Sequence, residues 1–372
     1  MPEGTAHSTG AADGPRTATT AGTTTATAAA TTTAASSAVE ASTAAAAGTT
    51  TTTTTADAPG ARPPRARLAG RRATVDALLR NSPLQPLFRL AARRRLAVLA
   101  YHGVDDPRVF ALQMERLVRH ARPVSPADVE QAVHDGRPLP PRSVLVTFDD
   151  GDRTVLTEGL PVLTRLGIPA AAFVVTDLIG GDQPFWWSEA AFLAAHGGTA
   201  RALADCPPGG VVRRMKTLAD RDRRTALAEL RESAGIRAPR QEQLTPDDLR
   251  ALVRGGVAVG NHTAGHPCLD RCEDDTVRSE VAGAHEALTG WLGQAPTAFA
   301  YPNGNLDPRA EAELRRLGYR AGFLFDHRHD RLLPPHPLRI SRLRVNSTTG
   351  RDRFDTILSG LHPAVHRLRG GA

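Results

Sequence analysis

Cysteine is scarce in this chain, and long apolar runs are missing. Three cysteines in 372 residues are too few for a disulfide framework, and an odd number cannot all pair with one another. This usage indicates a reducing compartment. No stretch reaches the roughly 20 consecutive apolar residues that a transmembrane helix needs. The start, Met-Pro-Glu-Gly, lacks the basic and strongly apolar regions of a secretory signal. We therefore expect a cytoplasmic location.

The first 64 residues lack any regular hydrophobic pattern. They are rich in Thr, Ala, Gly and Ser, and residues 49–55 are all threonine. Such a composition cannot bury enough apolar surface to offset the entropy cost of ordering the backbone. We expect residues 1–64 to form a disordered Thr/Ala-rich tail. Its Ser/Thr-rich, acid-poor composition also weakly resembles a transit peptide.

The positive charge comes from arginine. A net charge of +7 and a pI of about 10.2 raise the question of a nucleic-acid or membrane partner. Zinc-finger spacing, a helix-turn-helix signature and a basic groove with interleaved aromatics are all missing, so we expect no nucleic-acid partner. Residues 65–95 combine arginines with spaced leucines, interrupted by Pro83 and Pro86. We expect a basic helical segment that packs on the domain with its arginines in solvent; the alternative is peripheral contact with an anionic membrane.

From residue 96 onward, short apolar runs alternate with helical patterns. This alternation is typical of repeated βα units with a mostly parallel sheet, and it predicts a distorted (β/α) barrel of about seven strands over residues 96–360. The candidate strands are 96–101, 143–148, 170–175, 257–260, 297–301, 321–325 and 340–345. The clearest helical patterns are 155–166, 276–292 and 308–317.

The pattern changes between residues 180 and 245. Phe185, Trp186 and Trp187 are followed by a long arginine-rich helical stretch at 211–234, with few strand signals. We predict a helical insertion over the barrel. Tryptophan rings near the barrel mouth suit stacking on a sugar, although we expect at least one of them to anchor the insertion instead.

Two carboxylates follow the predicted strand 143–148. Adjacent side chains at a strand end point in different directions, so one of Asp149 and Asp150 can bind a cation while the other handles a proton of the water that the cation activates. In α/β barrels the carboxyl ends of the strands carry the chemistry. The alternative, a pair of solvated loop acids, is weakened by a second cluster farther along the chain.

That second cluster contains two histidines. His262 and His266 lie four residues apart after the predicted strand 257–260, where both imidazoles can turn toward one ion. Two histidines and a carboxylate form the usual ligand set of a catalytic divalent metal with open positions, which suits Zn²⁺ and also Co²⁺ or Ni²⁺. Cys268 and Cys272 are nearby, but a structural zinc cluster would need a second ligand pair at matching spacing.

These segments resemble a known family. Thr-Phe-Asp-Asp-Gly at 147–151 and His-Thr-Ala-Gly-His-Pro at 262–267 are similar to the first two motifs of the polysaccharide deacetylases (NodB homology, carbohydrate esterase family four). The resemblance covers roughly residues 96–354. It implies a hydrolase of carbon–nitrogen bonds in linear amides, which releases acetate from an N-acetylated carbohydrate partner.

The resemblance also implies roles for individual residues. Asp149 would be the catalytic base. Asp150, His262 and His266 would bind the metal, zinc first and cobalt or nickel as alternatives, and Thr263 would brace the histidine loop.

The third family motif is altered. Ala-Tyr-Pro-Asn-Gly at 300–304 lacks the family's arginine, which orients the base, and carries Asn303 at the aromatic position. Asn303 would keep the oxyanion role through its backbone N–H, which needs no particular side chain. Arg342 is our candidate to replace the missing arginine on Asp149; a salt-bridged strand end is the alternative.

An early element resembles the family branch that de-N-acetylates exopolysaccharides. Leu-Ala-Tyr-His-Gly-Val at 99–104 places a Tyr-His pair near the start of the domain, and by this resemblance His102 is the general acid. In that branch the order of the motifs is permuted, so the histidine that supplies the acid comes early. His336 is the alternative, because it lies near the place where family members with the ordinary motif order keep this histidine.

Two other functions stay open from the sequence. The same metal-water chemistry would suit a carbohydrate O-acetyl esterase, and the altered third motif would suit a catalytically inactive carbohydrate-binding member. The sequence does not define the oligomeric state or the length of the substrate.

Overall fold

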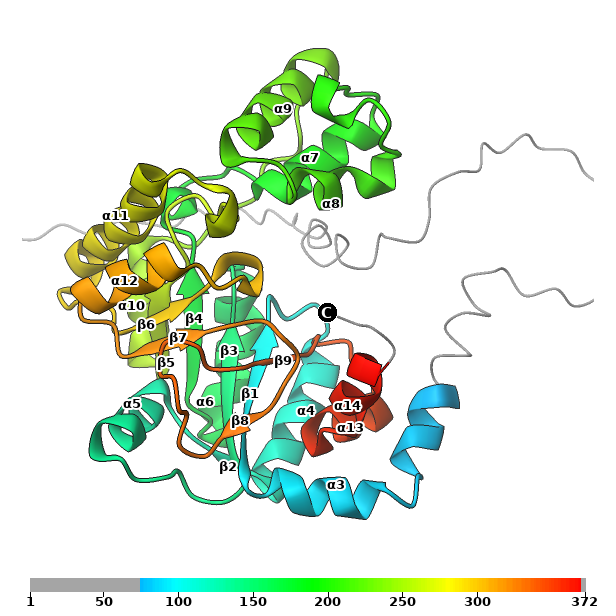
Figure 1. The fold of residues 1–372 in the computed structure, drawn as a ribbon, viewed down its shortest axis with the longest axis vertical. Helices are drawn as coiled ribbons and strands as arrows, with labels where there is room; N and C mark the ends of the chain where they lie inside the picture. The colour runs from blue at the N-terminus through cyan, green and yellow to red at the C-terminus, as the bar shows by residue number, and fades with distance from the viewer. Residues whose placement is uncertain (1–73, 369–372) are drawn as a thin grey trace, which may run out of the picture. The chain divides into compact units, whose positions relative to one another are not determined.

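The computed structural model describes residues 74–368, and within them nine strands form a single sheet (Figure 1). The main path runs β7-β6-β5-β4-β3-β1-β8, with β2 beside β3 and β9 beside β1. The strands are β1 Arg95–Tyr101, β2 Arg122–Pro123, β3 Ser143–Phe148, β4 Ala170–Val174, β5 Val257–Asn261, β6 Ala298–Ala300, β7 Ala321–Phe323, β8 Asp330–Arg331 and β9 Leu343–Arg344. The predicted tail 1–64, and residues 65–73 of the basic segment, lie outside the described residues.

The sheet is parallel except at β8, and its two ends are joined by residues 340–345. The backbone N–H of Ile340 donates to the Gly322 carbonyl of β7 at 2.7 Å, and the N–H of Val345 donates to the Ala100 carbonyl of β1 at 3.1 Å. The predicted distorted α/β barrel is therefore confirmed. Only β9 in this joining segment is a regular strand, because the chain changes partner from β7 to β1 within six residues.

Side chains alternate between two apolar layers along the strands. On β1, Val98 faces an inner cluster with Phe173 and Phe323, whereas Leu99 packs in an outer cluster against the helices. On β3 all residues are buried, as expected for a parallel strand covered on both faces. Because β3 alternates in the same way, Leu145 belongs to the inner cluster, which directs the polar end of the strand toward the barrel interior.

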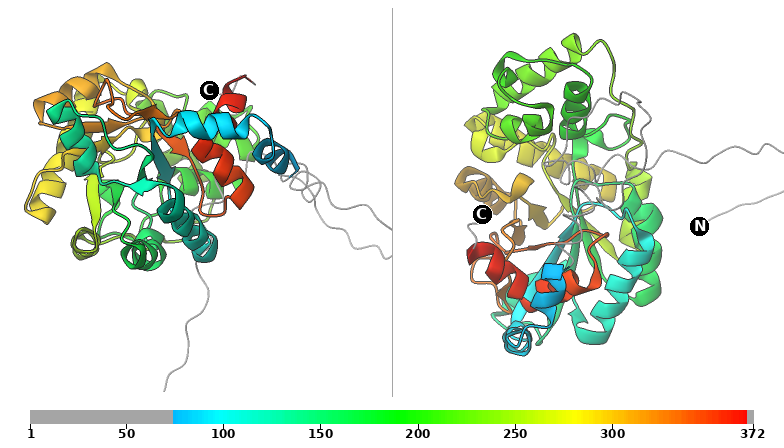
Figure 2. Two further views of the ribbon diagram at one scale, coloured as in Figure 1. Left: turned by 90° about the horizontal axis from the view of Figure 1, so that it is seen from below. Right: turned by 90° about the vertical axis from the view of Figure 1, so that its right-hand side faces the viewer.

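Helices flank the sheet on several sides (Figure 2). They are α4 Pro107–His120, α5 Pro126–Asp135, α6 Leu160–Leu166, α10 Pro246–Arg254, α11 Asp274–Leu292 and α12 Pro308–Arg316. Among the described helices, α4, α5, α10 and α12 begin with an Asp, Ser or Thr cap followed by proline, which supplies an acceptor to free N–H groups and a preset φ. The predicted helix 155–166 starts with a π-helical turn, η2 Val155–Gly159, before α6.

The insertion forms a helical lobe beyond the carboxyl ends of the strands (Figure 1). It contains α7 Trp186–Ala195, α8 Val211–Met215 and α9 Asp220–Ser233, which share an apolar cluster that includes Phe185 and Leu230. The predicted helical stretch 211–234 consists of two helices, α8 and α9, because the chain turns at 216–219 and packs Leu218 onto this cluster. Single 3₁₀ turns occur at η3 Thr176–Leu178, η4 Arg201–Leu203, η5 Pro208–Gly210, η6 Leu269–Arg271 and η7 Pro302–Gly304.

The described part of the basic segment is a helix at 74–80 followed by α3 Gln85–Ala92. It contacts the C-terminal helix α13 Arg351–Ser359, which α14 Leu361–Leu368 follows. The contact is polar, since Arg80 donates to Asp355, whereas Leu78 and Leu87 are 68% and 63% exposed. The leucines therefore do not form the packing face that the spacing suggests. No helix within 74–368 is long and apolar enough to cross a membrane.

Candidate active site

The two carboxylates after β3 are separated by a left-handed turn. Asp149 continues the inward alternation of the strand, and its N–H donates to the Tyr101 carbonyl at 2.9 Å. Asp150 has φ 70°, and Gly151 has φ 82°. A Cβ at position 151 would lie only 3.2 Å from Cγ1 of Val174. This backbone costs free energy in an Asp residue, and it turns the second carboxylate away from the first.

The histidine loop after β5 is braced by side chains of its own. Asn261 donates to the Val281 carbonyl at 3.0 Å and to the Tyr319 hydroxyl at 2.7 Å, and its own oxygen accepts the N–H of Thr263. The Thr263 hydroxyl in turn accepts the N–H of His266 at 3.0 Å. Thr263 and His266 both have positive φ, so these hydrogen bonds hold a backbone shape that would otherwise be unfavourable.

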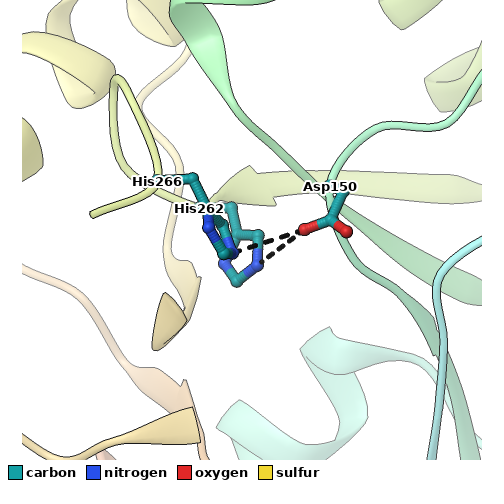
Figure 3. Close-up of side chains that lie close together, drawn as sticks. All are labelled: Asp150, His262 and His266. Carbon is teal, nitrogen blue, oxygen red and sulfur yellow. Dashed lines mark ion pairs between the residues drawn. The ribbon is translucent and has the colours of Figure 1, made fainter. Parts of the chain in front are cut away.

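The three predicted metal ligands come together (Figure 3). Asp150 Oδ1 lies 3.4 Å from Nε2 of His262 and 3.4 Å from Nε2 of His266. Two atoms each about 2.1 Å from one tetrahedral ion would be separated by about 3.4 Å. Asp150 Oδ1 is buried without a hydrogen-bond partner, as an atom that belongs to a metal would be. The donor set and its geometry therefore fit a divalent cation.

The protonation states of these ligands also suit a metal. Burial would raise the pKa of Asp150, but the two histidines outweigh it and hold this pKa below its ordinary value. Burial, helped by the charge of His262, lowers the pKa of His266 to about 3, so its imidazole is neutral. His262 Nδ1 lies 2.7 Å from the Ala300 carbonyl, which fixes the tautomer that leaves Nε2 free to bind.

Asp149 is held by a buried arginine. Arg342 is fully buried and donates from Nη1 to Oδ1 at 2.6 Å and from Nη2 to Oδ2 at 2.7 Å. Its Nη1 also contacts the Thr147 hydroxyl, and its Nε donates to the Leu324 carbonyl. Burial would raise the pKa of Asp149, but the guanidinium of Arg342 outweighs it and keeps this pKa below its ordinary value. The carboxylate is thus ionised and fixed in orientation.

All four of these acidic and imidazole groups face one cavity of about 300 Å³. Its lining residues are His102, Gly103, Asp105, Asp149, Asp150, Trp187, Lys216, His262, His266, Asn303, Gly304, Phe325, Arg344, Asn346 and Ser347. His102 follows β1 and contacts the ring of Phe325. His336, the alternative acid, is exposed on the loop before β9 and is not one of these residues.

Asn303 reaches the cavity through a strained turn in η7. It has φ 56°, and the next residue is Gly304, where a Cβ would lie only 2.3 Å from Phe325. Its side chain donates to Cys268 Sγ at 3.0 Å. Burial raises the pKa of the Cys268 and Cys272 thiols to about 11 and about 12, so both stay protonated. Within residues 74–368, Asp150 and the two histidines are the only cluster with metal-ligand spacing.

The insertion contacts the site through its tryptophans, as expected for at least one of them, and it also contributes a lysine. Trp186 donates from Nε1 to the carbonyl of His266 at 3.1 Å, and the ring of Trp187 lies 4.6 Å from the imidazole of His266. Both tryptophans are buried, so they attach the insertion to the histidine loop. Lys216 and Arg344 also line the cavity. The adjacent tryptophans in the sequence indicated the contact between the insertion and the barrel. No sequence pattern indicated that Lys216 lines the cavity.

Known proteins share this fold and parts of this sequence. A putative polysaccharide deacetylase of Bacillus subtilis, YxkH, is 16% identical over 236 residues, which are 61% of this chain and 63% of that protein. The chain spans only 42% of a second curated relative. The activity and substrates of those whole proteins therefore do not transfer directly.

Two solved structures share the fold at low sequence identity. The Streptococcus pyogenes deacetylase PplD in complex with acetate superposes with a TM-score of 0.51, at 16% identity and with coverage of 71% of this chain and 98% of that one. IcaB from Ammonifex degensii gives 0.50 at 22% identity, with 72% and 96% covered. The sequence profile of the polysaccharide deacetylases matches residues 136–322, half of the chain. This chain therefore belongs to the polysaccharide deacetylase family.

Proposed function

We propose that this protein is a metal-dependent hydrolase that removes the acetyl group from an N-acetylated amino sugar. The observation that carries the proposal is the pairing of two adjacent carboxylates with separate partners. Asp150 faces His262 and His266. Asp149 is bound by Arg342 and stays available to a proton in the same cavity. Membership of the family supports deacetylation.

Asp150, His262 and His266 would hold the divalent cation, with Zn²⁺ as the first candidate and Co²⁺ or Ni²⁺ as alternatives. When bound, such a cation polarises a carbonyl group and lowers the pKa of water. The side chains of the cavity supply the remaining steps.

The proposed reaction is hydrolysis of an acetamide. Asp149 accepts a proton from water as the water oxygen bonds to the carbonyl carbon, and Arg342 keeps the carboxylate ionised and oriented for this step. The backbone N–H of Asn303 donates to the developing oxyanion. His102 then gives a proton to the nitrogen as the carbon–nitrogen bond breaks, which yields acetate and a free amino sugar. His102 is favoured over His336 because only His102 lines the cavity.

Acetate release from N-acetylglucosamine oligomers of increasing length tests this proposal, with acetylated xylan as the ester substrate and a chelator as the control. We expect release from the amide substrates, loss with chelator and recovery with Zn²⁺ or Co²⁺. Release from xylan alone would assign an O-acetyl esterase instead.

Asp149→Asn tests the role of the base. Because the amide cannot accept the proton, the rate should fall about 100- to 10,000-fold while the bound metal is retained. Unchanged acetate release by this variant would remove Asp149 from the mechanism, and loss of metal would place it among the ligands.

A further inference from the structure

The cavity contains the only lysine of the chain. The sequence has 46 basic residues, of which 45 are arginines, and Lys216 is the single exception. It follows α8 in the insertion, where Met215 is fully buried and the Lys216 N–H donates to the Val212 carbonyl at 3.0 Å. The backbone of Lys216 is thus fixed by the lobe, while its side chain lines the active-site cavity.

The insertion is attached to the histidine loop, which places this ammonium group close to the reacting centre. Trp186 binds the His266 carbonyl, and Arg223 stacks over the Trp186 ring at 4.7 Å while it pairs with Asp220. These contacts connect the lobe to a proposed metal ligand.

Among the described residues Lys216 has no carboxylate partner, in contrast to several arginines of the insertion. Five arginines of the same insertion are paired, in the ion pairs Arg201–Glu229, Arg223–Asp220, Arg224–Asp220, Arg231–Glu189 and Arg240–Asp182. Within the described part of the chain, no carboxylate lies within ion-pair distance of Lys216. An unpaired cation directed into a cavity attracts an anion from solution.

A second cation lies on another wall of the cavity. Arg344 of β9 donates to the Phe325 carbonyl at 3.0 Å, and its guanidinium lies 4.7 Å from the centroid of the Phe325 ring. No carboxylate in residues 74–368 forms an ion pair with Arg344 either. Its side chain is therefore oriented by a carbonyl and a ring, and its positive charge is left for a ligand.

The carboxylates of the cavity cancel only part of the positive charge once a divalent cation is bound. Asp149 is paired with Arg342, and Asp150 faces two histidines. Asp105 accepts a hydrogen bond from the Ser347 hydroxyl at 3.4 Å. With a divalent cation on Asp150, the cavity has an excess of positive charge.

We propose that Lys216 and Arg344 bind an anionic substituent, a phosphate or a carboxylate, of the amino-sugar substrate. This inference rests on the proposed function and names its substrate class. A lysine suits the role because its ammonium is a compact point charge on a flexible stem, and it can follow an anion whose position varies between substrates. The guanidinium of Arg344 adds a planar fork that matches either oxyanion.

Titration calorimetry on metal-loaded Asp149→Asn protein tests the proposal without turnover. The ligands are N-acetylglucosamine, N-acetylglucosamine 1-phosphate and N-acetylmuramic acid, which differ in having no anion, a phosphate or a carboxylate. We expect at least one charged sugar to bind about tenfold more tightly than the neutral one. Which of the two charged sugars binds better identifies the source of the anion.

Substitution at Lys216 then separates its effect from that of the metal, which also attracts anions. Lys216→Ala should abolish most of the preference for the charged sugar, and Lys216→Arg should keep most of it. Arg213→Ala is the matched control, because it removes one positive charge from an exposed position on α8 outside the cavity.

Three results would overturn the proposal: equal binding of charged and neutral sugars, no binding of either charged sugar, or a preference that survives in Lys216→Ala. These results are independent of the deacetylase assignment. Acetate release from a neutral substrate by a protein that has no preference for anions would leave the proposed function intact. Conversely, a preference for charged sugars that depends on Lys216, found without any acetate release, would support the anion site but refute the proposed deacetylase activity.

Discussion

At the scale of single residues, Arg342 is our candidate to replace the arginine that the third motif lacks. It lies 193 positions from Asp149 in the sequence, yet it donates to both carboxylate oxygens from a fully buried position. Such a bidentate contact fixes orientation as well as charge, and a lysine cannot reproduce it. Asp149, the proposed base, is thus oriented by a segment near the end of the barrel rather than by the loop after β6.

Arg342→Gln should move the acid limb of the pH–rate profile to higher pH. The guanidinium keeps the pKa of Asp149 below its ordinary value, so the carboxylate remains a base as the pH falls. Without it, burial raises this pKa, and the ionised base is lost at a higher pH. The measurement is kcat/KM for acetate release against pH at saturating metal.

Arg342→Lys is the companion variant. This variant keeps a positive charge but loses the two parallel hydrogen bonds of the guanidinium group. We therefore expect it to keep more of the low-pH activity than Arg342→Gln, with a lower kcat because Asp149 is less well oriented. If the acid limb of Arg342→Gln coincides with that of the wild type, then Arg342 does not control the charge of Asp149.

At the scale of elements, apolar patterns predicted most strands because parallel strands are buried on both faces. Residues 143–148 form β3 as predicted, and α11 and α12 differ from their predictions by two residues or fewer. The failures occurred where tertiary contacts decide the structure. Residues 340–345 read as one strand, but only Leu343–Arg344 are regular, because the segment changes its hydrogen-bond partner.

The insertion supports the histidine loop through Trp186. Trp186→Phe keeps most of the apolar volume but removes the hydrogen bond to the His266 carbonyl. Since partners of metal ligands typically contribute 10- to 100-fold to metal affinity, we expect the Kd for Zn²⁺ to rise about tenfold. Competition with a chromogenic chelator measures this change.

Trp291→Phe is the control for Trp186→Phe, because Trp291 lies on α11 and packs in the outer cluster of the barrel. Equal metal affinity in both variants would mean that the lobe does not position the ligand loop.

At the scale of the whole molecule, the site joins segments that are far apart in the sequence. The candidate ligands Asp150, His262 and His266 were predictable because each cluster follows an apolar strand, and parallel strands end at the same edge. The positions of Lys216 and Arg344 in the cavity were not predictable. They depend on how the insertion and the joining segment fold over the barrel, and no local pattern encodes that geometry.

We propose that one carboxylate and two imidazoles from distant segments bind one divalent cation. Metal analysis of the purified protein, after incubation with Zn²⁺ and removal of the excess, tests it most directly. We predict about one equivalent per chain for the wild type and for His336→Ala, whose exposed imidazole lies outside the cavity, and far less for Asp150→Ala, His262→Ala and His266→Ala. Equal metal content in all five proteins would mean that these three side chains do not hold the cation.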